Sequence, residues 1–135
     1  MSNLIFIAVC LLGLFLVTIH SNQEHEIRFA TLVLGTQPIK VEVVTTDQEM
    51  YQGLSGRTKL CSNCGMLFTF SKASRQTFVM RQMNFPLDII WLNHGKFIGV
   101  NANLTPEKEP YTLYQSPAPV DQVLEVNAGF YETIK

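Results

Sequence analysis

Charged residues are scarce in this sequence. Asp, Glu, Lys and Arg make up 16% of the 135 residues, and the formal net charge is -1. Proteins that bind nucleic acids need a stripe of Lys and Arg to neutralise phosphates, so we expect no DNA or RNA partner. The sequence also lacks G-x-S-x-G, H-E-x-x-H, a phosphate-binding loop and any recognisable nucleophile–base pair. Whether the protein is an enzyme is uncertain on this basis, and the balance favours a non-catalytic role.

No charged residue interrupts the run from Leu4 to Ile19, which ends at S-N-Q-E-H-E. Its sixteen residues lie between a signal-peptide core and a bilayer span of about 20 residues. We therefore expect residues 1–21 to be a signal peptide or an N-terminal membrane anchor. No A-x-A cleavage site is present, which favours the anchor, although cleavage after Ser21 stays open. Cys10 does not end the apolar run as a lipidated cysteine should, so we expect an ordinary small residue there.

The rest of the chain, residues 22–135, has the size of a single domain, and its patterns are mainly those of β-strands. Apolar and polar residues alternate from Ile39 to Val44, the period of a half-buried strand. The sequence T-D-Q-E at 46–49 is a capping box, which predicts a short helix from Asp47 to Leu54. The expected strands are 27–34, 39–44, 66–70, 76–80, 87–92, 96–100 and 123–126. We expect a mainly β (α+β) fold, a small compact β-barrel-like domain with one short helix.

Three motifs recur in a fixed order: G-L-S-G-R at 53–57, G-M-L-F-T-F at 65–70, and T-F-V-M-R-Q-M-N-F-P-L-D-I-I-W-L at 77–92. This pattern resembles the bacterial and archaeal family known as domain of unknown function 192. The resemblance covers about residues 41–129 and continues through E-V-N-A-G. Val79 stands where the family usually has Trp, and Ser55-Gly56 stand where many members have Met-Phe. The family implies a fold but no activity that can be carried over.

Two charged residues in these motifs are candidates for a binding site. Alternation along L-D-I-I-W-L makes both faces of that strand apolar, so the carboxyl of Asp88 must find donors or be neutralised. Arg57, Arg81 and nearby amides are possible donors. Asp88 is either a structural carboxylate or a polar group at the mouth of an apolar pocket. Arg57 either pairs with Asp88 or binds an anionic ligand.

Cys61 and Cys64 can close a disulfide, ligate a metal or exchange electrons. Because paired cysteines usually oxidise outside the cytoplasm, a structural disulfide is the first interpretation. The alternative is an envelope metal or redox protein, with copper as cofactor, which adds the thioethers of Met80 and Met83 to the two thiolates. For both methionines, packing as ordinary core residues among phenylalanines is favoured over copper binding. No cofactor is expected under the first interpretation.

Residues 103–121 are polar and contain four prolines, so we expect a long loop without regular structure. Tyr111 and Tyr114 lie in this loop and could join Trp91 and Phe97 as an aromatic platform for a sugar ring. Trp91 fits the core equally well. We expect the ligand site to be a cleft bordered by Arg57, Met80, Asp88 and this loop.

The sequence thus predicts an exported binding module with no catalysis of its own. Its ligand would be a small molecule, a glycan or an envelope protein. Residues 4–19 would contact the membrane, and the domain would lie in the periplasm or at the cell surface. A hydrolase or lyase that uses Asp88 with Arg57 is a distant further alternative.

Overall fold

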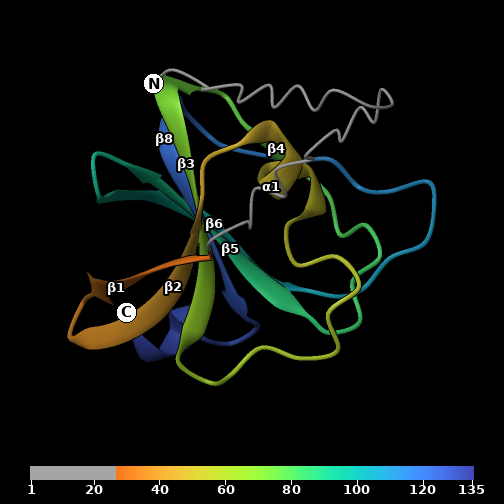
Figure 1. The fold of residues 1–135 in the computed structure, drawn as a ribbon, viewed down its shortest axis with the longest axis horizontal. Coiled ribbons are helices and arrows are strands. Elements are labelled where there is room, and N and C mark those ends of the chain that lie inside the picture. Colours follow the sequence, from red (N-terminus) through yellow and green to blue (C-terminus); the bar gives the residue numbers. More distant parts are fainter. Residues whose placement is uncertain (1–26) are drawn as a thin grey trace, which may run out of the picture.

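About half of residues 27–135, the part of the chain that the computed structural model describes, lies in β-strands. The elements are β1 (Arg28–Leu34), β2 (Gln37–Val44), α1 (Asp47–Gln52), β3 (Cys64–Ser74), β4 (Thr77–Phe78), β5 (Leu87–Asn93), β6 (Lys96–Leu104), β7 (Tyr114–Gln115), β8 (Val120–Asn127) and the 3₁₀ helix η1 (Tyr131–Thr133). Six strands form one sheet in the order β1-β2-β3-β8-β5-β6, and β4 pairs with β7 (Figure 1).

The mainly β prediction is confirmed, and the domain is compact, but the sheet is not closed into a barrel. β1 and β6 are its two edges, and no strand ladder joins them within residues 27–135. Only β2 and β3 run parallel, while the other neighbouring pairs are antiparallel. β4 and β7 pair with each other instead of bridging the two edges.

The predicted capping box forms as expected at the start of α1. The Glu49 amide donates to Thr46 Oγ1 at 3.3 Å, and the Thr46 amide donates to Glu49 Oε2 at 2.8 Å. α1 ends at Gln52, earlier than predicted, because Gly53 turns the chain with a φ of 48°. The helix therefore stops directly above the sheet, where it covers one end of a face.

Apolar residues cover both faces of the sheet, and each face has its own core. The first face carries Phe68, Ile89, Trp91 and Val123. The second face carries Leu67, Ile90, Leu92 and Leu124. The predicted alternation of L-D-I-I-W-L is therefore confirmed. Met50 of α1, Phe78 of β4 and Tyr114 of β7 pack on the first face.

The segment 103–121 contains more regular structure than the sequence predicted. β6 continues past Val100 into this segment, and β7 lies within it. The predicted strand 76–80 is shorter, because only β4 forms a ladder there. The Ser116 amide donates to the Gln76 carbonyl at 2.9 Å, and the Gln76 amide donates to Ser116 Oγ at 3.0 Å. These contacts join residues forty positions apart, which local patterns do not reveal.

Among residues 27–135 no helix is long and apolar enough to cross a membrane. The predicted signal peptide or anchor at residues 1–21 lies outside the described residues.

Asp88 joins three elements on the second face of the sheet. The residue is fully buried on β5. Its Oδ1 accepts from the Asn103 amide at 2.7 Å, and its Oδ2 accepts from the Tyr131 amide at 2.9 Å. Two backbone donors stabilise the carboxylate and tie β5 to β6 and η1. The partners of Asp88 are therefore amides rather than arginines, which agrees with a structural carboxylate.

We predict that Asp88→Ala lowers the free energy of unfolding by about 2–4 kcal/mol, because two part-buried backbone amides lose their carboxylate acceptor. Urea denaturation measures this change. Asp121→Ala is the matched control, since Asp121 of β8 accepts from the His94 amide at 2.9 Å in an exposed hydrogen bond. The control should lose less than about 1 kcal/mol. Equal losses in the two variants would contradict the special role of Asp88.

Candidate functional site

A cavity of about 310 Å³ lies over the first face of the sheet, between α1, β3, β4 and β8. Its wall combines apolar and polar side chains in equal number, and the uncharged polar ones are Gln52, Ser55, Gln76 and Thr77. The apolar side chains are Met50, Leu54, Phe68, Phe70, Phe78, Val79 and Met83. The charged or titratable side chains in the lining are Tyr51, Arg81 and Glu125. The volume lies at the lower end of the range for sites that bind small organic molecules.

The aromatic part of the wall is held by ring packing. Phe68 and Phe78 lie edge to face with centroids 4.9 Å apart, and Phe78 meets Trp91 in the same way at 5.7 Å. A Cβ atom on Gly53 would lie 3.4 Å from the Phe68 ring, so the turn after α1 rests directly on that ring. The cavity is therefore bounded by side chains whose positions are fixed by the core.

Glu125 is the chemically unusual residue of this cavity. It lies on β8, between Met66 of β3 and Ile89 of β5 in the strand register, and only 6% of the residue is exposed. No hydrogen bond or ion pair joins its carboxyl to the described residues. Burial without a charged partner raises the pKa of Glu125 to about 8. The lining of the cavity thus contains a carboxyl without a partner among the described residues.

Arg81 lies in the lining of the same cavity and links it to α1. Its guanidinium lies 3.8 Å from the centroid of the Tyr51 ring and also donates to the Tyr51 carbonyl. Ser55 Oγ donates to the Arg81 carbonyl at 2.9 Å. These contacts hold the segment after β4 against the end of α1, and they place one positive charge in a cavity that also holds a buried carboxyl.

The residues expected to border one cleft do not come together. Arg57 forms an ion pair with Glu42 on β2, with Arg57 Nη2 2.8 Å from Glu42 Oε2, and does not pair with Asp88. Met80 is fully buried in the core of the first face, whereas Asp88 lies on the second. The cleft expected between these residues and the loop is therefore absent from the described structure.

The aromatic residues proposed as a sugar platform are also separated. Trp91 belongs to the core of the first face, and its Nε1 donates to Asn101 Oδ1 at 2.8 Å. Phe97 stacks on Tyr131 with centroids 5.4 Å apart. The Tyr114 hydroxyl donates to the Glu107 carboxylate, which raises the pKa of Tyr114 and lowers the pKa of Glu107. Tyr111 is half-buried in the loop before β7. Ligand binding by Tyr111 and Tyr114 stays a prediction.

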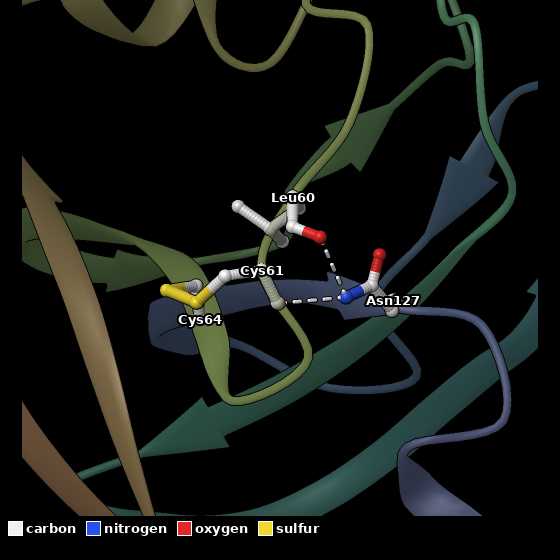
Figure 2. The surroundings of a disulfide bond; sticks show 4 residues. All are labelled: Leu60, Cys61, Cys64 and Asn127. Carbon is white, nitrogen blue, oxygen red and sulfur yellow. Dashed lines mark hydrogen bonds between the residues drawn. A yellow bond between two sulfur atoms is a disulfide. The ribbon is translucent and has the colours of Figure 1, made fainter.

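Cys61 and Cys64 form the disulfide that was the first interpretation, with their Cα atoms 5.1 Å apart. Asn127 Nδ2 donates to the Cys61 carbonyl at 2.8 Å, which fixes the loop against the end of β8 (Figure 2). The copper alternative would require the reduced pair, because bonded sulfurs supply no thiolate. Met80 and Met83 are both buried in the core of the first face. Within residues 27–135, no group of three His, Cys, Asp or Glu side chains could hold a metal ion.

Our sequence reasoning did not select Glu125. A signal was present, because a lone Glu interrupts the apolar residues of Val123 to Val126, and alternation places it on the face of Val123. Glutamate is common on the solvent side of strands, so this signal was ambiguous until both faces of β8 were seen to be covered.

Two solved structures resemble this fold. A proposed transcription regulator from Sinorhizobium meliloti 1021 is 27% identical, with a TM-score of 0.71, and the match covers 80% of this chain and 88% of that protein. A protein of unknown function from Novosphingobium aromaticivorans DSM 12444 is 29% identical, with a TM-score of 0.72 and coverage of 87% and 84%. No curated protein matches the sequence.

The family resemblance seen in the sequence is supported by a match to a family model, which is described as DUF192, uncharacterized ACR. That model matches residues 30–135, which include every strand that lines the cavity. This chain therefore belongs to the DUF192 family.

Proposed function

We propose that this chain is a binding domain for a small organic molecule, that it acts outside the cytoplasm, and that it has no catalytic activity of its own. The observation that carries this proposal is the cavity on the first face with the unpaired carboxyl of Glu125 in its lining. A concave site that combines apolar side chains with polar groups is the usual form of a small-molecule site.

The cost of Glu125 to the folded protein supports this interpretation. Burial of a carboxyl without a hydrogen bond or charge partner is unfavourable. An apolar residue would suit this position on β8, because Met66 and Ile89 flank it. Residues that break a local packing rule without local compensation are typical of functional sites. The carboxyl is therefore best explained as a contact to a ligand.

The same lining supports binding rather than catalysis. Ser55 is the serine of the lining, and its hydroxyl is bonded to the Arg81 carbonyl instead of a base. Glu125 has no hydrogen-bonded partner that would orient it as a general acid or base. The name of the Sinorhizobium protein suggests a role in transcription. For this chain, a net charge of -1 argues against nucleic acid as a partner.

The proposed location rests on two observations. The Cys61–Cys64 disulfide is of a kind that persists in oxidising compartments. The apolar run at residues 4–19 precedes the domain and has the composition of an export signal or anchor. Binding of an envelope protein or a glycan remains a further option for the exposed loop that carries Tyr111.

We predict that fragments identified by ligand-observed NMR bind at least tenfold more weakly to Val79→Trp, because the added indole ring fills the cavity. Val79 lines the cavity, whereas Val33 is 61% exposed on the edge strand β1. Val33→Trp is therefore the matched control and should bind like the wild type. Fragments that bind both variants equally well would place the binding elsewhere and count against this site.

We predict that Glu125→Gln removes a pH dependence from the stability of the domain. The pKa of Glu125 is about 8 in the folded protein, above the ordinary value of 4.5. Between these values the folded state keeps a proton that the unfolded state has lost, so the wild type loses stability as the pH rises from 4.5 to 8.

At pH 8 the Gln variant should therefore be more stable than the wild type by a few kcal/mol, with roughly 4 kcal/mol as the upper figure. Chemical denaturation at pH 5, 6.5 and 8 measures the difference. Glu132→Gln is the control, because the Glu132 side chain is 56% exposed and its pair with Lys135 lies at the surface. A pH-independent difference between Glu125→Gln and the wild type would contradict the burial argument.

We predict that alkaline phosphatase fused after Lys135 is active in bacterial cells only when residues 1–21 are present, since this enzyme needs export to fold. The exported domain should have an intact mass two hydrogens below that of the reduced chain. Equal phosphatase activity without residues 1–21, or free thiols in the exported form, would argue against the proposed location.

A further inference from the structure

The chemistry of the cavity wall narrows the class of ligand. We propose that the cavity binds a small organic monoamine in its protonated form, with the ammonium group against the carboxylate of Glu125 and the apolar body among Phe68, Phe70 and Phe78. This inference rests on the proposed function and names the ligand class of the same site.

The position of Glu125 favours a cation over other polar ligands. The carboxyl lies in the lining of the cavity and has no partner among the described residues. At Glu125 itself an anionic ligand would meet a like charge or a neutral acid. A cation supplies the opposite charge, and an ammonium group also supplies the hydrogen-bond donors that an ionised carboxylate needs.

The remainder of the wall is also suited to a cation with an apolar body. Three phenylalanine rings and the side chains of Met50 and Met83 line the cavity. Ring faces attract an ammonium group through their quadrupole, and this attraction grows when water is excluded. Thioethers are polarisable and adapt to irregular apolar shapes. The wall therefore accepts both the charge and the hydrocarbon part of such a ligand.

The other charged groups set a limit of one positive charge. Arg81 lines the same cavity, held over the ring of Tyr51, and would repel a second ammonium group at that end. Glu42 lies on the neighbouring side of Met66, but it already forms an ion pair with Arg57. Met66 and Ile89, which flank Glu125 on the adjacent strands, carry no charge. Monoamines should therefore bind more tightly than diamines.

Binding of such a ligand must displace a proton. Burial raises the pKa of Glu125 to about 8, so its carboxyl is mostly protonated in the free protein at pH 6.5. The incoming ammonium ion keeps its own protons, and the carboxyl releases one proton to solvent as the ion pair forms. Affinity should then increase with pH up to about 8, where the free carboxyl becomes ionised.

Isothermal titration calorimetry at pH 6.5, in buffers of different ionisation enthalpy, tests this mechanism with defined probes. The probes are benzylamine, the neutral analogue benzyl alcohol, and the diamine 1,4-diaminobutane. Benzylamine should bind with the release of nearly one proton, and more tightly than the other two probes. Glu125→Gln should lower the affinity for benzylamine at least tenfold and abolish the proton release. Glu132→Gln should change neither the affinity nor the proton release.

The remaining outcomes separate the two proposals. If benzyl alcohol or any NMR fragment binds in a Val79-dependent way while benzylamine binds no more tightly than the alcohol, the amine inference is wrong and the binding function stands. If benzylamine binds without proton release, or binds equally to Glu125→Gln, the assigned contact is wrong. If no probe and no fragment binds, the proposed function fails, and the amine inference fails with it.

Discussion

The rest of the structure depends on the burial of both faces of β5 and β8 at the centre of the sheet. Successive side chains of a strand point to opposite faces, so these two strands supply residues to two cores at once. The central residues of both strands, 87–92 and 123–126, are buried and have no solvent side on which a charged residue could be placed. Each strand carries one buried carboxyl, Asp88 on β5 and Glu125 on β8. A buried carboxyl lowers the stability of the fold unless it receives hydrogen bonds or a positive charge.

The two carboxyls have opposite environments. Asp88 accepts from two backbone amides, and through them it joins β5 to β6 and η1. Glu125 receives no such donors and lies in the lining of a cavity. The hydrogen bonds of the first carboxyl stabilise the fold, whereas burial of the second costs stability, and we propose that the second binds a ligand. The same kind of side chain thus has a structural role on one face and a proposed functional role on the other.

The cavity exists because elements distant in the sequence meet over the first face. α1 is positioned by its capping box and by Gly53, and Arg81 lies over Tyr51 at the same place. The disulfide fixes a different region, the loop that leads into β3, and it makes no contribution to the cavity lining. Two relatives share the fold at 27% and 29% identity, which extends the architecture to them but not the chemistry of Glu125.

The sequence by itself determined the mainly β class, the capping box and the two apolar faces of residues 87–92, because each depends on residues close together in the chain. It made a Cys61–Cys64 disulfide the first interpretation and left a metal or redox role open. Only the tertiary structure decided that Arg57 pairs with Glu42, that the sheet stays open, and that Glu125 faces a cavity. The partners of Asp88 are 15 and 43 positions away in the sequence. The pairing register of β5 with β6 positions the first partner, and the packing of η1 against the sheet positions the second. Local periodicity gives the face on which a side chain lies, but the elements that cover that face decide whether its charge is exposed, paired or left for a ligand.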